Sequence, residues 1–460
     1  MEHYIGVLTS LVSVPGIAAA GFDPAELECS AVLVQGLLKG VGFPDVRIVR
    51  SAPGPNASDP GVASGGAPGV FAARKGAPGM PTVLLYAHHD VQPPGPLDEW
   101  ATTPFAAVRR DGRLWGRGSA DNKAGIVMHL AAVEALDTVL GSGNGLGIRV
   151  FIEGEEESGS PTLARFLQEF AAELTADAAI VADSGSWAVG TPALTTSLRG
   201  LVDGTIRVRV LDHALHSGTY GGPVLDALAV LGRLMASFHD DDGSVAVEGL
   251  ARGPVPAVEM DEATFRRDAG IPAGAQLAGT GSITSRLWNQ PAVSFIGLDA
   301  QPTASAGNVL LPEAVVKVSV RLPPGNDPDH AMDALRRHVL QHTPFGAEAT
   351  FTPGARSRPF RVAPGDPMIR SALWSHETAW GANAVTMGVG GSIPFVAALA
   401  EAMPDCSIVV TGAEDPDSRA HGANESVHLG ELRNAIVAEA LFLAGLAGDR
   451  QEPATSRRRK

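Results

Sequence analysis

The chain has 460 residues, of which 45% are hydrophobic and 18% are charged, a balance typical of a folded globular protein rather than a disordered or fibrous one. Its formal net charge of −15 argues against a nucleic-acid partner, because phosphate binding needs clustered Lys and Arg. The length favours two or three domains with a core large enough to enclose a site.

Cysteine content and the absence of export signals indicate a cytoplasmic protein. Only Cys29 and Cys406 occur, and neither belongs to a CxxC pair or a disulfide framework. The N-terminus lacks a basic segment followed by an apolar run, and no stretch of about 18 apolar residues appears. We therefore expect no membrane partner. The basic run at 456–460 belongs to a segment, 451–460, that we expect to be a flexible tail.

The first half of the chain predicts helices followed by an α/β alternation. The spacing of Ile5, Leu8, Leu11 and Val12 predicts an amphipathic helix, and residues 51–69 are expected to form an exposed loop. Apolar runs of strand length then alternate with helical patterns, which predicts an α/β domain with a mainly parallel sheet. The expected strands cover 82–86, 148–152 and 178–181, and the expected helices lie near 25–38, 123–136 and 161–174.

The pattern changes near residue 199, which predicts a second domain inserted into the first. An alternating strand and a long helix occur twice in this region, at 205–210 with 224–238, and at 315–320 with 329–341. We therefore expect a smaller α+β domain at 199–360. The first domain is then discontinuous, covering 1–198 and 361–450, and it resumes with a strand at 407–411 and a helix near 429–446.

The strand at 82–86 runs directly into Ala87-His88-His89-Asp90. In open α/β sheets, ligands bind at the carboxyl ends of the strands. Neutral imidazole is a good zinc ligand, and a carboxylate close behind it can orient the ring through its other nitrogen. We therefore predict that His88 is a metal ligand and that Asp90 orients it.

Four further motifs place acidic or imidazole groups at the same expected edge. Asp121 lies in a tight loop that opens a helix, where it is either the N-cap or a ligand. Acid runs are usually solvated, but the run 153–157 follows a buried strand, which favours metal coordination together with a general base. Asp183 ends another apolar strand, and His421 lies in the loop after the strand at 407–411. Together the five motifs predict a metal centre.

These motifs resemble those of the co-catalytic zinc hydrolases, a family that includes carnosinase-like dipeptidases, glutamate carboxypeptidase, aminoacylase and succinyl-diaminopimelate desuccinylase. The resemblance spans nearly the whole chain, and the HxDVQPP…EW…PF stretch from His88 to Phe105 looks most like the dipeptidase branch. It implies two divalent ions, zinc first, with manganese or cobalt as alternatives.

The resemblance also implies a role for each residue of the metal centre. His88 and Asp183 would bind one ion, Glu157 and His421 the other, and Asp121 would bridge the two. Glu156 matches the general base, which would deprotonate the bridging water and pass the proton to the leaving amine. The fold class implied is a mainly parallel-sheet α/β hydrolase domain with an inserted α+β lid or dimerisation domain.

Residues of the inserted region, together with Ser392 in the part of the first domain that follows it, resemble the family's substrate contacts. The segment around His216 looks like the dimerisation-domain motif whose His reaches the partner subunit's active site, so a homodimer and a catalytic, substrate-binding role for His216 are expected. Arg321 matches the residue that binds the substrate carboxylate in the family. Asn308 matches a residue that makes a polar contact to the substrate, and Ser392 lies in a segment that matches the glycine-rich substrate loop. Taken alone, His216 would be an ordinary histidine and Arg321 a surface strand charge.

The chain departs from the dipeptidase pattern at two places. The first bears on substrate choice, and the second is expected to have little effect on metal coordination. Gly388 and Val389 stand where dipeptidases usually carry an Arg-Glu pair, and Asn122 stands where an Asp is frequent. If the missing carboxylate helps to place a charged amino terminus, a blocked amine or an unusual amide would be preferred. The expected activity is hydrolysis of the amide bond of dipeptides or small peptides. An N-acyl amino acid deacylase or carboxypeptidase is the alternative, and an inactive binding or assembly relative is a third interpretation.

Overall fold

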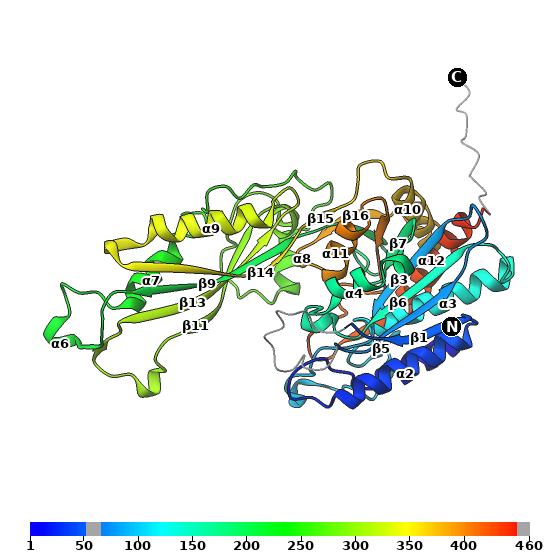
Figure 1. Cartoon of the computed structure of the whole chain (residues 1–460), viewed down its shortest axis with the longest axis horizontal. Helices are drawn as coiled ribbons and strands as arrows, with labels where there is room; N and C mark the ends of the chain where they lie inside the picture. The colour runs from blue at the N-terminus through cyan, green and yellow to red at the C-terminus, as the bar shows by residue number, and fades with distance from the viewer. Residues whose placement is uncertain (52–65, 449–460) are drawn as a thin grey trace, which may run out of the picture. The chain divides into compact units, whose positions relative to one another are not determined.

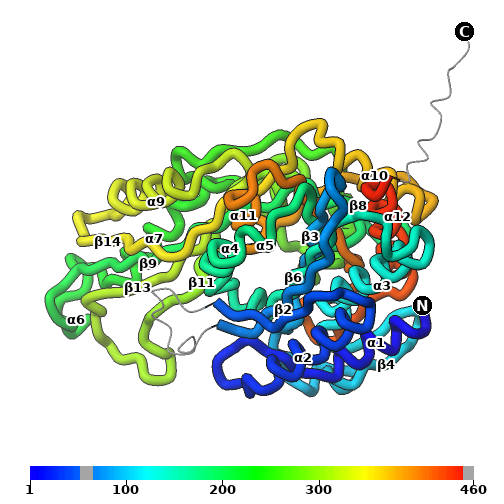
Figure 2. The backbone as a smooth tube through the Cα atoms, turned by 45° about the vertical axis from the view of Figure 1, so that its right-hand side comes forward, coloured from blue at the N-terminus to red at the C-terminus, as the bar shows by residue number. Residues whose placement is uncertain are grey.

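The computed structural model describes residues 1–51 and 66–448. The tail expected at 451–460, and most of the loop expected at 51–69, lie outside these residues. The chain divides into two compact units. Unit 1 comprises Met1–Thr196, Val362–Met387 and Pro394–Lys460, and unit 2 comprises Ser197–Arg361 and Gly388–Ile393. The blue-to-cyan start and the orange-to-red end of the chain both belong to unit 1, and the green-to-yellow middle forms most of unit 2 (Figure 2).

A central sheet organises unit 1. Its strands follow one another in the order β1 (Asp45–Val49), β2 (Gly69–Arg74), β6 (Gly147–Glu153), β3 (Thr82–His88), β7 (Ala178–Val181), β17 (Ser407–Val410) and β8 (Ala193–Leu198), with β15 (Phe360–Arg361) and β16 (Val385–Val389) paired to β8. The four central strands β6, β3, β7 and β17 are parallel, whereas the outer pairings are antiparallel. The expected mainly parallel sheet is confirmed, and its four central strands end at one edge.

Helices cover both faces of this sheet because its central strands are apolar on both sides. The helices of unit 1 are α1 (Glu2–Val12), α2 (Pro24–Gly40), α3 (Lys123–Leu140), α4 (Leu163–Glu169), α5 (Ala171–Leu174), α10 (Pro367–Trp380), α11 (Pro394–Ala402) and α12 (Leu429–Leu446). On β3, Val83 and Leu85 share a core with α1, α3 and α12. Tyr86 points to the other face and stacks on Phe395 of α11, with ring centroids 3.7 Å apart. Figure 1 shows α3 and α12 on one side of β3 and β6, and α4 and α11 on the other.

Sequence periodicity located the long helices well. The apolar stripe expected near the N-terminus is buried in α1, and the last helix, expected near 429–446, is α12. Within the described residues no helix is long and apolar enough to cross a membrane. A small sheet of β4 (Val108–Arg110), β5 (Arg113–Trp115) and β18 (Ser426–His428) completes unit 1.

A buried histidine links α3, α12 and β3. His129 Nδ1 lies 2.8 Å from Glu439 Oε1, and His129 Nε2 lies 2.9 Å from the backbone oxygen of Tyr86. Both partners are acceptors, so the imidazole donates through both nitrogens and carries a positive charge. Burial by itself lowers the pKa of His129, but the Glu439 carboxylate outweighs it and raises the pKa above 6.5.

We expect this pair to make stability depend on pH. A folded-state pKa above the unfolded value means that the stabilisation is complete below about pH 6.5 and is lost as pH rises through the folded value. His129→Gln should therefore cost about 3 kcal/mol at pH 6 and less at pH 9. Urea denaturation of both proteins at the two pH values measures the difference, and an equal loss at both would show that the charge on His129 is irrelevant.

Unit 2 contains a four-stranded antiparallel sheet with helices on one face. The strands follow the order β11 (Ala292–Asp299), β13 (Glu313–Leu322), β9 (Gly200–Arg209) and β14 (Glu348–Ser357), and the longer helices are α7 (Ala227–Ala236), α8 (Glu262–Asp268) and α9 (Pro328–His342). Val202, Ile206 and Val208 of β9 face the core under α7 and α9, and the alternate residues face away from it. A two-stranded ladder of β10 (Leu215–His216) and β12 (Val309–Leu310) lies beside α6 (Ser217–Tyr220).

The short segment Gly388–Ile393 belongs to unit 2, whereas the sequence placed all of 361–450 in the first domain. The physical reason is hydrogen bonding to Arg199, which lies just before β9. The Arg199 backbone N–H donates to Val389 O at 3.2 Å, and its Nε donates to Gly390 O at 2.9 Å.

Candidate metal centre

Consecutive strands of the unit 1 sheet deliver acidic or imidazole groups to one edge. His88 is the last residue of β3, and Glu157 lies in the short 3₁₀ helix Glu156–Ser158 that follows β6. Asp183 comes just after β7, and Glu414 comes shortly after β17. The order β6, β3, β7, β17 therefore sets these four side chains in a row, because parallel strands end on the same side of the sheet.

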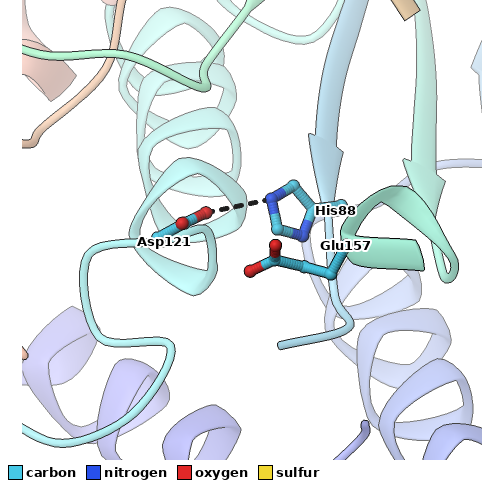
Figure 3. Close-up of side chains that lie close together, drawn as sticks. All are labelled: His88, Asp121 and Glu157. Carbon is cyan, nitrogen blue, oxygen red and sulfur yellow. Dashed lines mark hydrogen bonds and ion pairs between the residues drawn. The ribbon is translucent and has the colours of Figure 1, made fainter. Parts of the chain in front are cut away.

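Asp121 lies at the centre of this group, with one carboxylate oxygen toward each imidazole. Its Oδ1 lies 3.1 Å from His88 Nε2, and its Oδ2 lies 3.0 Å from His421 Nε2. A second carboxylate accompanies each imidazole, since His88 Nε2 lies 3.5 Å from Asp183 Oδ1 and His421 Nε2 lies 3.2 Å from Glu157 Oε2. Figure 3 shows His88, Asp121 and Glu157 pointing toward one another. The five predicted ligands are thus brought together.

The contacts around α3 and β3 show which neighbours of the cluster lie in it and which do not. The N-cap of α3 is Asn122 and makes no side-chain cap bond, so the Asp121 carboxylate is not the N-cap. Asn122 instead donates its Nδ2 to Asp183 Oδ1 at 2.9 Å, which holds that carboxylate in place. His89 is buried with its Nε2 2.7 Å from Pro68 O, and it stays apart from the cluster.

The residues at this edge fit a divalent cation. The ligand atoms of His88, Asp121 and Glu157, and likewise those of Asp121, Asp183 and Glu414, lie within 4.8 Å of one another. Hydrogen bonds to Asp121 and Glu157 raise the pKa of His421 to about 10, which means that the carboxylates attract positive charge strongly. Imidazole nitrogens and carboxylate oxygens are the donors that zinc, manganese and cobalt accept.

Glu414 is the member of this group that sequence reasoning missed. Burial raises its pKa well above the usual range, and the nearby charges of Asp121 and Asp183 add to this. The signal was present, because Glu414 follows an apolar strand just as Asp183 does.

Glu156 lies beside the candidate ligands, and its carboxylate has no partner among the described side chains. Burial raises its pKa well above the usual value, and the charge of Asp183 raises it further. Among the described residues, the Glu156 carboxylate has neither a hydrogen bond nor an ion pair with another side chain. A carboxylate in this position is available to exchange protons with a substrate or a water molecule.

Asp90 does more than orient the imidazole. His88 Nδ1 lies 3.0 Å from the backbone oxygen of Asp90 and 3.4 Å from its Oδ1. The carboxylate also accepts the backbone N–H groups of Glu156 at 3.2 Å and Glu157 at 3.0 Å. Asp90 therefore fixes the turn that carries Glu156 and Glu157 relative to His88.

A fully buried carboxylate, Glu425, holds the loop that carries Asp121. Its Oε1 accepts the backbone N–H groups of Ala120 and Asp121, both at 3.0 Å, and its Oε2 accepts that of Gly118 at 2.9 Å. Arg117 Nη1 donates to the same Oε2 at 2.6 Å. Sequence reasoning gave Glu425 no role, although it lies in the motif that contains His421.

Two arginines hold the loop that bears His421, and one of them, Arg117, belongs to the Asp121 loop. Arg117 Nη2 donates to the backbone oxygens of His421 at 3.1 Å and Gly422 at 3.2 Å. His421 has a φ of 63°, a left-handed backbone conformation that is uncommon for a non-glycine residue and needs such support. Arg113 holds the beginning of the same loop through a two-pronged ion pair with Asp415, at 3.1 and 2.8 Å.

The remaining predicted residues lie in unit 2 and form two neighbouring pairs. His216 is exposed at the end of β10, and Asn308 precedes β12, its partner strand. The backbone oxygen of Asn308 accepts the Ser217 N–H at 3.0 Å. Arg321, on β13, donates through Nη1 to Ser392 Oγ at 3.5 Å.

Comparison with known proteins relates the chain to peptidases. Residues 84–444 match the model of peptidase family M20/M25/M40. The chain is 34% identical to the cysteinylglycine-S-conjugate dipeptidase of Corynebacterium striatum, over 79% of this chain and 80% of that protein. It is 26% identical to the mouse Beta-Ala-His dipeptidase, over 78% of this chain and 76% of that protein. The solved structure of the dipeptidase Dug1p from Saccharomyces cerevisiae has the same fold, with a TM-score of 0.81, 21% identity and coverage of 98% and 97%.

Proposed function

The chain belongs to peptidase family M20/M25/M40 and is a metallopeptidase, and we propose that it hydrolyses the amide bond of free dipeptides or small peptides. The observation that carries the proposal is the position of Asp121, whose two oxygens each face a different imidazole. A carboxylate shared between two ligand pairs suits a two-ion hydrolase. The similarity to a Cys-Gly conjugate dipeptidase and to a Beta-Ala-His dipeptidase supports a dipeptide as substrate.

We assign the ligands of two divalent ions, zinc in the first instance, from the observed contacts. His88 and Asp183 would hold one ion, Glu157 and His421 would hold the other, and Asp121 would be shared. Glu414, which lies with Asp121 and Asp183, is a further candidate on the His88 side. When bound, the ions would lower the pKa of the attacking water and stabilise the negative charge that develops on the carbonyl oxygen.

Glu156 is the proposed general base. It would take a proton from the attacking water and then deliver it to the leaving nitrogen, which is the same carboxylate acting first as base and then as acid. Two features support this role. Its carboxylate has no partner among the described side chains, and Asp90 fixes its backbone, so that the proton acceptor is held in one place.

The substrate contacts are proposed from the resemblance of unit 2 to the family's inserted domain. Arg321 would bind the substrate carboxylate, and Ser392 and Asn308 would make polar contacts to the substrate. His216 would act in the active site of a partner subunit, which requires a homodimer; its exposure at the end of β10 agrees with this. Light scattering of the purified protein tests the dimer.

A cytoplasmic location is also proposed, and both cysteines are free thiols.

A deacylase or carboxypeptidase activity is the second candidate. The observation that favours it is Val389, which provides no carboxylate for a free amino terminus. A panel of free dipeptides and N-acetyl amino acids decides between the two. Cleavage confined to the acetylated compounds would contradict the dipeptidase proposal and support a deacylase.

Removal of metal is expected to abolish turnover reversibly. Chelation by EDTA followed by dialysis should leave less than about 1% of the dipeptide hydrolysis, because the carboxylates and imidazoles alone cannot activate water sufficiently. Two equivalents of zinc, manganese or cobalt should restore it, as measured by activity together with metal content. Turnover that survives complete metal removal would contradict the proposal.

A further inference from the structure

Two arginines of unit 2 lie close together on the face of its sheet that is turned away from the helices. Arg321 pairs with Leu201 across β13 and β9, and the neighbouring Leu322 pairs with Gly200, the residue that follows Arg199. Val320 and Leu322 are in the core, so Arg321 faces the other way. Burial lowers the pKa of Arg199 to about 10, and the charge of Arg321 contributes, as expected for adjacent cations.

Neither guanidinium has an acidic partner among the residues that the structure describes. Arg199 is only 9% exposed, and it donates to the backbone oxygens of Gly390 at 2.9 Å and Gln290 at 3.4 Å. Arg321 is half-buried and donates to Ser392 Oγ at 3.5 Å. Neutral acceptors satisfy some of the N–H groups, but two positive charges remain without compensation in a partly dehydrated place, which is costly.

The exposed arginines of the same sheet are paired. Arg207 binds Glu313 at 2.9 Å and Arg209 binds Glu348 at 3.4 Å, although their side chains are 53% and 44% exposed and gain little from it. Thus the exposed Arg207 and Arg209, which water already solvates, have acidic partners. The more buried Arg199 and Arg321 have none among the described residues. Since the described part of the chain supplies no acidic partner for Arg199 and Arg321, a ligand is the better candidate for their counter-charge.

A nearby acid is engaged elsewhere. Asp203 of β9 lies 3.6 Å from Lys317 Nζ, and its Oδ1 accepts the Ala355 N–H at 2.9 Å. It forms no ion pair with either Arg199 or Arg321 within the described part of the chain.

The segment Gly388–Ile393 packs closely against the Arg199 side chain. A Cβ atom on Gly390 would lie 2.8 Å from Arg199 Nη2, so only glycine leaves the guanidinium in its place. Among the residues that the structure describes, a Cβ atom on Gly391 would meet only Val389, at 3.9 Å, so these residues leave open space beside Gly391. Val389 itself adds no negative charge.

We propose that Arg199 and Arg321 together form a site for two carboxylates, and that the preferred substrates are dipeptides whose C-terminal residue is aspartate or glutamate. This rests on the proposed function. Arg321 binds the terminal carboxylate and Arg199 binds the side-chain carboxylate, so that each buried cation gains its own counter-charge. A single carboxylate would leave one of the two cations uncompensated.

The test compares substrates of equal shape and different charge. Hydrolysis of Ala-Glu against Ala-Gln, and of Ala-Asp against Ala-Asn, is measured on the metal-loaded enzyme. The acidic member should have a kcat/KM about tenfold higher or more, mainly through a lower KM, because a charged hydrogen bond to a desolvated guanidinium is gained. Equal values for both members of each pair would overturn the proposal.

Variants assign the effect to Arg199. In Arg199→Gln the preference for the acidic member should disappear, and in Arg199→Lys it should be partly retained. Arg207→Gln, on the same sheet but exposed and paired with Glu313, serves as the matched control and should keep both the preference and the activity. A preference that persists in Arg199→Gln would overturn the assignment.

A binding measurement separates this inference from the proposed function. Titration calorimetry with free L-glutamate and L-glutamine needs no turnover, and glutamate should bind about tenfold more tightly to the native protein but not to Arg199→Gln. If no dipeptide is cleaved but glutamate is still preferred, the dipeptidase proposal fails and the dicarboxylate site stands. If neutral dipeptides are cleaved and glutamate is not preferred, the dipeptidase proposal stands and the dicarboxylate site fails.

Discussion

Glu156→Gln is expected to remove about 99% to 99.99% of dipeptide turnover while leaving the bound metal in place. The variant keeps the shape of the side chain but cannot accept a proton from the attacking water, a function worth about a hundredfold to ten-thousandfold in rate. Metal should remain, because the proposed ligands are other residues and Asp90 still holds the backbone N–H groups of Glu156 and Glu157.

Two companion variants make this result specific. Glu157→Gln, at the adjacent position, should lose metal as well as activity, because it removes a proposed ligand of His421's ion. Glu28→Gln, an exposed residue paired with Arg50, should behave as the native protein. Metal analysis of each purified variant is paired with kcat on one dipeptide. A Glu156→Gln enzyme that retains its turnover would show that the base lies elsewhere.

Glu425→Gln is expected to weaken metal binding by about tenfold to a hundredfold, although this residue touches no ligand side chain. The substitution replaces one carboxylate oxygen by an NH₂ group, which donates and cannot accept. Either Arg117, or the N–H groups of Ala120 and Asp121, then lose their acceptor. Residues that position ligands from behind usually affect affinity by this factor. Loss of one partner of a buried ion pair should also cost about 3 kcal/mol of stability.

The measurement is a competition titration of zinc against a chelator, together with urea denaturation of the metal-free protein. Glu2→Gln, which breaks the exposed pair with Arg109, is the control and should change neither quantity measurably. Unchanged metal affinity in Glu425→Gln would mean that the Asp121 loop keeps its shape without this carboxylate.

The fold of unit 1 was accessible from the sequence because its signals are local. Apolar strand-length runs such as Thr82–Tyr86 and Ala178–Val181 alternate with helical spacing, and this alternation is typical of a parallel sheet covered on both faces. Parallel strands end at one edge, so the residues that follow them, His88 and Asp183 among them, could be expected to meet. Both signals depend only on the order of residues along the chain.

The detailed arrangement depended on contacts between distant segments. The Asp121 carboxylate was ambiguous until the structure placed His88 and His421, separated by over three hundred positions, on its two oxygens. Glu425 was overlooked for the same reason, since its partners Arg117 and Ala120 precede it by about three hundred positions. A buried carboxylate reveals its role only through the donors around it.

The sequence by itself determined the α/β class and the acidic charge, and it supplied the acidic and imidazole residues proposed as metal ligands, because periodicity, composition and residue chemistry are properties of the chain alone. Only the tertiary structure decided that Glu414 lies with Asp121 and Asp183 and that Gly388–Ile393 belongs to unit 2. It also decided that, within residues 1–51 and 66–448, Arg199 and Arg321 have no acidic partner. The physical reason is that coordination, hydrogen bonding and charge compensation depend on distances of a few ångströms between residues whose separation in sequence carries no information about them.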